Sequence, residues 1–314
     1  MHKKDFRTID PLALVPLWNK FYPSRYAIDE DLFKLNTVDS PLFDWGASVV
    51  AYENSHPVAF VVIKRSASRL YRGPDPDTLH INSLAFVDPE FAIDLLADVK
   101  KILRNRGAHQ LVFGQDSRHF FPGCPTDAVA LRNFLMVEGF QETGCAYDLE
   151  RDLTDYYNPA RETDKAIYRV LVEDDRKSLL TFFEKQFPGR WRHDVLDKVA
   201  MEGLSHCVFG LIIEGQVQGF ALIQNQEQRR PIGGAVWRND LGENWGSLGP
   251  IGIAKEIRGQ GFGNRLLGEA LDYLKKLGVR RCIIDWTTLR EYYEKHGFQV
   301  TRSYQSMSLP LERL

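Results

Sequence analysis

The stretch Arg258-Gly259-Gln260-Gly261-Phe262-Gly263 decides how the second half of this 314-residue chain folds. It follows an apolar segment, Ser247–Ile253, and opens a segment in which apolar residues recur at helical spacing as far as Gly278. Glycine permits positive φ and carries no Cβ, so a phosphate group can come close to the free backbone N–H groups at the start of a helix. Arg258 adds a positive charge with fork-shaped donors. The pattern therefore predicts a strand, a tight turn and a helix that bind a pyrophosphate.

The rest of the second half alternates between short apolar runs and helical periodicity. Strands are predicted at Tyr168–Val172, Cys207–Ile213, Val217–Gln224, Ser247–Ile253 and Arg281–Asp285, and helices at Ser178–Gln186, His193–Met201 and Leu289–Lys295, before a last strand pair. The residues Glu214-Gly215-Gln216 separate two of these strands and are typical of a hairpin turn.

The first half repeats parts of the second. Gly139-Phe140-Gln141-Glu142-Thr143 matches Gly297-Phe298-Gln299-Val300-Thr301 at an offset of 158 residues, and 107–113 matches 278–284 at an offset of 171. The difference of 13 residues places an insertion in the first repeat near 117–125. Because 152–165 is polar, contains a proline and lacks a hydrophobic period, we expect a linker there. The predicted domains are 1–151 and 166–314.

Composition narrows the classes of function. With 44% apolar and 26% charged residues, both halves can bury ordinary cores, and a net charge of −2 gives no field that would capture nucleic acid. The cysteines lack the spacing of a zinc site or a redox pair, so no metal is expected; they are Cys124, Cys145, Cys207 and Cys282. The first residues do not resemble a signal peptide and no apolar run reaches the length of a membrane span, so we expect a cytoplasmic protein without a membrane partner.

A second motif, Tyr293-Glu294-Lys295-His296-Gly297-Phe298, lies downstream of the glycine-rich turn. Arg258-x-x-Gly261-x-Gly263 together with Tyr293-x-x-x-Gly297-Phe298 resembles the two signatures of the GNAT superfamily of N-acetyltransferases, over roughly Tyr168 to Leu309. The resemblance implies an α/β (α+β) fold of two tandem GNAT-like domains, each a mixed, splayed, mostly antiparallel sheet flanked by helices. It also implies acetyl-CoA as a co-substrate, direct transfer of acetyl to an amine, and no metal.

The resemblance also assigns the residues that would bind acetyl-CoA. The backbone N–H groups of the turn and the first helical residues would hold the pyrophosphate; these are Gln260, Gly261, Phe262, Gly263 and Asn264, beside Arg258 and Gly259. The strand residues Ile251, Gly252 and Ile253 would pair with the amides of the pantetheine arm, where the fourth and fifth strands part.

Two residues are candidates for the chemistry. Tyr293 occupies the position where the family commonly keeps its general acid, and a phenol with a pKa of about 10 can donate a proton to a thiolate whose thiol has a pKa of about 8.5. The alternative is a tyrosine that only packs in the core, which is what we expect of Tyr292. Asp285 ends an apolar strand and is predicted to accept the proton of the attacking amine, or alternatively to cap the helix after Thr287.

The acceptor is the least specified part. Asp285-Trp286-Thr287 also resembles tandem-domain bacterial acetyltransferases that act on glucosamine and glucosaminides, in which such an aspartate serves as the base. The aromatic rings of Trp237, Trp245 and Trp286 suit a sugar, although tryptophan is equally typical of a core. His119 lies in the inserted loop and is a candidate acceptor ligand or base, or simply a solvated side chain. The loop itself either shapes the acceptor pocket or is a surface loop anchored by Phe120 and Phe121.

The first repeat lacks the features that would bind acetyl-CoA. At the offset of 171 the turn corresponds to Val87-Asp88-Pro89-Glu90-Phe91-Ala92, which has no glycine, and Asp88 and Glu90 would repel a pyrophosphate. Leu135 stands where the second repeat has its tyrosine. We therefore predict that domain 1–151 is a degenerate GNAT-like domain without a working site for acetyl-CoA.

The sequence as a whole predicts an acetyl-CoA-dependent N-acetyltransferase for a small-molecule primary amine, in first place the amine of glucosamine or a glucosaminide. The alternatives are a peptide, polyamine or antibiotic amine. A further alternative is a non-catalytic acyl-CoA sensor, which the retention of Tyr293 and Asp285 disfavours. No nucleic-acid partner is expected, and the sequence does not specify an oligomeric state.

Overall fold

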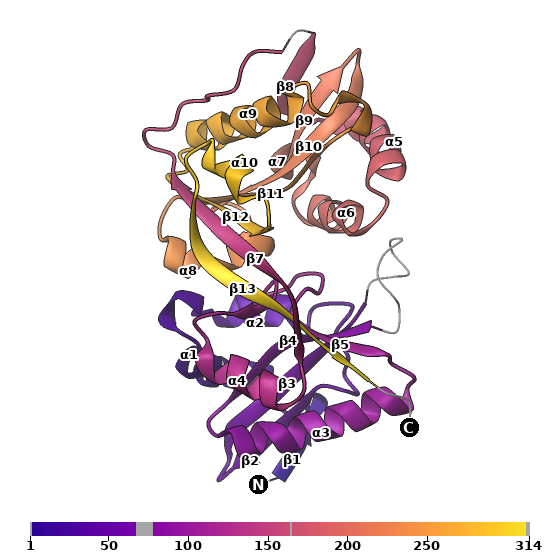
Figure 1. Ribbon diagram of the computed structural model, residues 1–314, viewed down its shortest axis with the longest axis vertical. Coiled ribbons are helices and arrows are strands. Elements are labelled where there is room, and N and C mark those ends of the chain that lie inside the picture. Colours follow the sequence, from indigo (N-terminus) through magenta and orange to yellow (C-terminus); the bar gives the residue numbers. More distant parts are fainter. Residues whose placement is uncertain (1, 67–77, 164, 312–314) are drawn as a thin grey trace. The chain divides into compact units, whose positions relative to one another are not determined.

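The computed structural model describes residues 2–66, 78–163 and 165–311, which form two compact units (Figure 1). Of the described residues, unit 1 contains 2–66, 78–146 and 302–311, and unit 2 contains 147–163 and 165–301. Each unit is a mixed, mostly antiparallel sheet with helices packed on it, which confirms the predicted fold class. No helix within the described ranges has both the length and the apolar character that crossing a bilayer requires.

The sheet of unit 1 has the strand order β1-β2-β3-β4-β5-β13, in which only the β4–β5 pair is parallel. Its strands are β1 (His2–Asp5), β2 (Val49–Glu53), β3 (His56–Arg65), β4 (Thr78–Phe86), β5 (Gln110–Phe113) and β6 (Cys124–Pro125), together with parts of β7 (Gln141–Asp152) and β13 (Gln299–Pro310). Its helices are α1 (Val15–Phe21), α2 (Glu30–Asn36), α3 (Pro89–Asn105) and α4 (Val129–Val137).

The sheet of unit 2 has the order β7-β12-β11-β10-β9-β8, with β11–β12 as its parallel pair. Its strands are β8 (Ala166–Val170), β9 (Val208–Ile213), β10 (Gln216–Asn225), β11 (Trp245–Ile253) and β12 (Arg281–Thr287). Its helices are α5 (Arg176–Gln186), α6 (Arg190–Glu202), α7 (Leu204–Cys207), α8 (Arg238–Leu241), α9 (Phe262–Lys276) and α10 (Arg290–Glu294). The predicted strands and helices of the second half are present, with ends displaced by a few residues, except that the single strand β13 takes the place of the predicted last strand pair.

Two apolar layers cover the opposite faces of the sheet of unit 2. Along β9, Phe209 and Leu211 pack with the leucines of α9, whereas Val208 and Ile212 pack with the phenylalanines and valines of α5 and α6. This alternation follows from the two-residue period of a strand, which sends successive side chains to opposite faces. Figure 1 shows α9 and the α5–α6 pair flanking these strands. Helix α9 ends before Gly278, whose φ of 86° suits the predicted glycine cap.

The parallel strands of unit 2 part shortly after they meet. Only Trp245–Ser247 pairs with 281–283, and the remainder of β11 keeps hydrogen-bonded pairing on its other edge, with β10. A bulge in β11, where Gly249 and Pro250 lie opposite Leu222 of β10, coincides with this departure and bends the strand pair locally. One edge of Ile251–Ile253 is therefore available to a ligand, as the splayed sheet expected from the sequence requires.

The boundary between the units differs from the predicted linker. The chain leaves unit 1 within β7, between Ala146 and Tyr147, and returns to it within β13, between Thr301 and Arg302. Residues 302–311, which we assigned to the second domain, complete the sheet of unit 1 because Ser308 pairs with Val112 of β5. An alternating apolar pattern predicts a strand but does not specify which neighbour it will pair with.

The inserted loop of the first repeat is fastened inside unit 1. Phe120 and Phe121 are buried, and their ring centroids lie 4.7 and 5.5 Å from that of Trp18. Before them, the fully buried Lys64 Nζ lies 2.7 Å from Asp116 Oδ2 and donates to the carbonyls of Ser117 and Arg118. These contacts show the loop anchored by its aromatic residues, as one of the two alternatives proposed, but largely buried and not at the surface as that alternative expected.

A second donor holds the same carboxylate. Asn82 Nδ2 on β4 donates to Asp116 Oδ2 at 3.0 Å, just beyond the last β4–β5 pair, Ile81 with Phe113. Burial by itself would raise the pKa of Asp116, but the charge of Lys64, with contributions from His80 and His119, holds that pKa below its ordinary value. The pair therefore remains ionised inside the unit.

We expect Lys64→Met to destabilise unit 1 strongly, because removing one partner leaves a buried charge without compensation, at a cost of about 3–5 kcal/mol. The double variant Lys64→Met/Asp116→Leu should be more stable than Lys64→Met, since it removes both charges. Urea unfolding of the wild type, both single variants and the double variant measures this. Additive losses in the double variant would contradict the coupling.

The same pair predicts a pH dependence. Because the pKa of Asp116 is lowered in the folded chain, its contribution to stability should be complete above the ordinary carboxyl pKa of about 3.9 and should be lost as the pH falls further. Unfolding of the Asp116→Leu variant should lack this component.

Candidate active site

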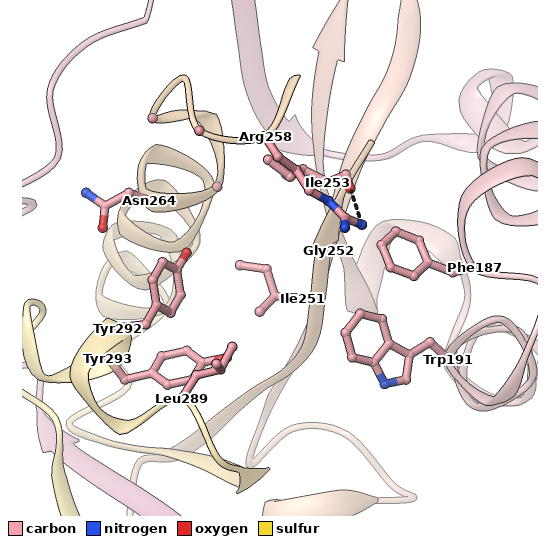
Figure 2. Close-up of a pocket in the computed structure, with 13 residues that line it drawn as sticks. Phe187, Trp191, Ile251, Gly252, Ile253, Arg258, Asn264, Leu289, Tyr292 and Tyr293 are labelled. Atoms are coloured by element: carbon pink, nitrogen blue, oxygen red, sulfur yellow. Dashed lines mark hydrogen bonds between the residues drawn. The ribbon is translucent and has the colours of Figure 1, made fainter. Parts of the chain in front are cut away.

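A pocket of about 520 Å³ lies in unit 2 where β11 leaves β12. Its lining residues are Phe187, Trp191, Ile251, Gly252, Ile253, Arg258, Gly259, Gly261, Gly263, Asn264, Leu289, Tyr292 and Tyr293. Figure 2 shows the two tyrosines on one side of Ile251 and the rings of Phe187 and Trp191 on the other. Every acetyl-CoA contact predicted from the sequence lines this pocket except Gln260 and Phe262, which lie between lining residues of the turn.

The glycine-rich turn presents bare backbone to the pocket. Gly259 and Gly261 have φ values of 78° and 89°, and an added Cβ at either would meet no atom within 4 Å. Gly261 is the N-cap of α9 and offers no capping side chain. The helical hydrogen bonds begin with Arg265 N–H donating to Gly261 O, so the N–H groups of the three preceding residues point along the helix axis towards the turn. Such a helix start suits an anion.

Arg258 lies beside the turn at the rim of the pocket. Its guanidinium contacts Ile253 O at 3.5 Å, drawn as the dashed line in Figure 2, and lies 6.0 Å from the centre of the Phe187 ring. The positive charge therefore stands between the exposed edge of β11 and the start of α9.

The corresponding connection in unit 1 is shorter. Eight residues, 254–261, join β11 to α9, whereas only Val87 and Asp88 join β4 to α3. Asp88 caps α3 by accepting from Glu90 N–H, and Pro89 follows as the first helical residue. The sequence comparison placed Val87–Ala92 opposite 258–263 as an altered turn. In the structure most of the turn is missing from the first repeat, and a capping carboxylate stands at the start of the helix.

An aromatic wall opposite the tyrosines was not identified from the sequence. Phe187 and Trp191 stack with their ring centroids 5.1 Å apart, and they cover Gly252. A Cβ on Gly252 would lie 2.6 Å from Phe187 Cζ, so only glycine allows this approach. The sequence feature that could have indicated this wall is the pair of aromatic residues on either side of Pro188-Gly189, in the connection between α5 and α6.

Tyr293 lines the end of the pocket away from the turn, and Asp285, which is not a lining residue, is near enough for its charge to act on the Tyr293 hydroxyl. Burial raises the pKa of Tyr293 well above its ordinary value, and the neighbouring Tyr292 and the charge of Asp285 raise it further, while a hydrogen bond with Thr287 opposes the shift. The phenol therefore keeps its proton at neutral pH, as a proton donor must.

Tyr292 also lines the pocket, although we expected it only to pack in the core. Its hydroxyl lies 3.7 Å from the position of a Cβ on Gly263, and burial raises the pKa of Tyr292 to about 12. Figure 2 shows its side chain directed towards the start of α9. The two consecutive tyrosines thus reach different parts of one pocket.

Asp285 is surrounded by glycine backbone. A Cβ on Gly233 would lie 3.0 Å from Asp285 Oδ2, and one on Gly249 would lie 3.7 Å from Oδ1. The helix-capping alternative assigned Asp285 to the start of the next helix, but Leu289 N–H there donates to Thr287 Oγ1 at 3.0 Å. The carboxylate thus lies close against backbone at positions where a larger residue would crowd it.

The predicted acceptor residues fall into three groups. Trp237 and Trp245 are buried, at 1% and 6% exposure. Trp286 is partly exposed, has a φ of 45°, and stacks with the Arg190 guanidinium 4.3 Å from its ring centre. His119 is a buried residue of unit 1 beside Asp116. Within the described ranges, no group of three or more His, Cys, Asp or Glu side chains is arranged to hold a metal ion.

Comparison with known proteins identifies the family of the second half. Residues 176–298 match the acetyltransferase (GNAT) family. A search of curated proteins by sequence finds no match.

Solved structures resemble the chain over nearly its full length. One is the GCN5-related glucosamine N-acetyltransferase region of a fungal multi-domain β-N-acetylglucosaminidase, with 21% identity and a TM-score of 0.84 over 98% of this chain and 38% of that one. The chain thus spans well under half of that fungal protein.

Two further structures match both repeats. A GCN5-related N-acetyltransferase from Sphaerobacter thermophilus has 14% identity and a TM-score of 0.70, over 99% of this chain and 96% of that one. A tandem GNAT protein from the clavulanic acid biosynthesis pathway has 13% identity and a TM-score of 0.66, over 96% and 94%. The second unit therefore contains the match to the acetyltransferase (GNAT) family, and the chain as a whole has the fold of tandem GNAT proteins.

Proposed function

We propose that this chain transfers acetyl from acetyl-CoA to the primary amine of an amino sugar such as glucosamine or a glucosaminide. The observation that carries the proposal is a pocket with Tyr293 at one end and the glycine-rich start of α9 at the other, in which the charge of Asp285 acts on the Tyr293 hydroxyl. A proton donor and a carboxylate near one reacting centre are what acyl transfer to an amine requires.

The pocket suits the shape and charge of acetyl-CoA. The open backbone of Gly259 and Gly261 and the helix start behind them fit a pyrophosphate, with Arg258 supplying positive charge. The free edge of Ile251–Ile253 offers hydrogen bonds to the amides of the pantetheine arm, and the Phe187–Trp191 wall covers its apolar side. Bound there, acetyl-CoA would supply the thioester whose acetyl group is transferred.

The two polar side chains at the far end divide the proton transfers. Asp285 orients the ammonium group of the acceptor and takes a proton from it, so that the neutral amine attacks the thioester carbonyl. Tyr293 gives its proton to the departing thiolate, and its raised pKa keeps the phenol protonated until then. The acylated nitrogen then loses its surplus proton to the Tyr293 phenolate, which restores the acid and leaves the neutral amide. These steps are general acid–base catalysis.

Trp286 supports an amino sugar as the acceptor. The residue follows Asp285 directly. Its backbone N–H donates to Asp148 Oδ1 at 3.2 Å, which helps to hold the positive φ at this position. A flat ring beside a carboxylate suits a sugar ring that carries an amine. Arg190, on one face of the indole, is paired with Asp194 at 2.9 Å, which offsets its charge towards a cationic acceptor. The fold likeness to a glucosamine N-acetyltransferase region agrees with this choice.

An amine panel tests the proposed reaction. Release of free thiol from acetyl-CoA should be fastest with glucosamine or chitosan oligomers, measured as kcat/KM against spermidine, lysine peptides and an aminoglycoside. N-acetylglucosamine, which has no free amine, is the control. A higher kcat/KM for a polyamine, peptide or aminoglycoside would overturn the choice of acceptor, and no release with any amine would favour the acyl-CoA sensor.

Tyr293→Phe should lower kcat by roughly 10- to 1,000-fold while the affinity for acetyl-CoA stays nearly unchanged, because it removes a proton donor and keeps the ring. Tyr292→Phe is the matched control, since it deletes a hydroxyl from the adjacent residue of the same pocket and should leave most of kcat. Steady-state kinetics and calorimetric titration with acetyl-CoA separate these effects. Equal losses in both variants would contradict the assignment.

Asp285→Asn keeps the size of the side chain but removes its ability to take a proton. We expect kcat/KM for the amine to fall by about 10²–10⁴-fold, with the thermal midpoint and acetyl-CoA affinity retained. If Asp285 served only the fold, the variant would instead lose thermal stability and keep its turnover.

A further inference from the structure

Two buried side chains, Tyr156 and His296, and the partly buried Asn264 connect the segment after β7 to the first turn of α9. Tyr156 Oη lies 2.7 Å from His296 Nδ1, and His296 Nε2 lies 3.0 Å from Asn264 Oδ1. Both Tyr156 and His296 are only 3% exposed. Asn264 lines the acetyl-CoA pocket, whereas the other two residues do not.

The direction of the hydrogen bonds follows from the chemistry of the partners. The amide oxygen of Asn264 can only accept, so His296 Nε2 carries a proton and donates it. Burial lowers the pKa of His296 to about 4, so at neutral pH the ring is uncharged and Nδ1 accepts from the Tyr156 hydroxyl. One tautomer thus satisfies both bonds and leaves a single favourable ring orientation.

These hydrogen bonds end at the first turn of α9, which lacks a capping side chain. Most helices fasten their first turn through a capping side chain, but here the N-cap is Gly261 and no side chain caps it. A capping side chain would compete with an anion for the same N–H groups. Asn264, the third residue of α9, is instead held from the side, and its neighbour Arg265 donates to Ala160 O at 3.0 Å.

His296 also belongs to the segment that carries the proposed acid. Its N–H donates to Tyr293 O at 2.9 Å, at the end of α10. A displacement of His296 would therefore change the structure both at the start of α9 and around Tyr293.

We propose, on the basis of the proposed function, that His296 is a positioning residue that holds the first turn of α9 in place through Asn264 and so sets the affinity for acetyl-CoA. Tyr156 fixes the tautomer and orientation of His296 from the far side. The N–H groups of the turn remain available to the ligand because the side-chain anchor does not use them.

The test measures binding of acetyl-CoA by calorimetric titration, which does not depend on turnover. His296→Phe keeps a buried ring but cannot donate, and we expect its Kd to rise about tenfold, a loss of roughly one buried hydrogen bond. His296→Gln can donate to Asn264 and accept from Tyr156, so it should keep most of the affinity. In the double variant His296→Phe/Asn264→Ala, Kd should rise no further than in the more affected single variant.

Leu204→Ala is the control for general loss of stability, since Leu204 is a buried residue of α7 in the other apolar layer of unit 2, which contains none of the three side chains. It should lower the thermal midpoint and leave Kd unchanged. Equal weakening by Leu204→Ala and His296→Phe, or an unchanged Kd in His296→Phe, would overturn the proposed role.

The outcome is distinguishable from failure of the proposed reaction. If the wild type binds acetyl-CoA and the variants weaken binding as expected, but no amine is acetylated, the positioning role stands and the catalytic proposal fails. If the wild type does not bind acetyl-CoA, both are overturned.

Discussion

The early parting of β11 from β12 is the constraint on which the active site of this chain depends. After three paired residues the two strands separate, so the edge of β11 that would face β12 is turned to a pocket. An open edge inside a sheet is a liability unless something covers it. Here α9 and the tyrosines close one side, and the Phe187–Trp191 pair closes the other against Gly252. Gly252 is therefore as necessary to the pocket as the residues proposed to take part in catalysis.

Unit 1 contains the same strand parting and seals it. Asn82 on β4 reaches Asp116 just beyond the last β4–β5 pair, and Lys64 fixes that carboxylate and the loop after it. With a two-residue connection to α3 there is no turn that could surround a phosphate. One repeat thus satisfies its parted strands with its own polar side chains, and the other leaves its strand edge and helix start open to a ligand.

The sequence predicted those features that depend on local chemistry. The glycines before α9, the amphipathic helix, Tyr293 and the carboxylate of Asp285 follow from spacing and residue type, and all lie in or beside one pocket. What could not be predicted depends on distant partners. The Phe187–Trp191 wall depends on the approach of α6 to Gly252. The pairing of β13 with β5 depends on which strand edge of unit 1 is unpaired without it. The sequence comparison did not reveal that most of the glycine-rich turn is missing from the first repeat. It used one fixed offset through this region, so the shorter connection was aligned as substituted residues.

The return of β13 to unit 1 has a consequence for the order in which the two units can fold during synthesis. Unit 2 needs residues up to Thr301, but unit 1 needs Arg302 to Leu311 to finish its sheet. During synthesis all strands of unit 2 are made before residues 302–311, which the β5 edge of unit 1 needs. Unit 2, which contains the glycine-rich turn and Tyr293, can therefore be complete while unit 1 is still unfinished.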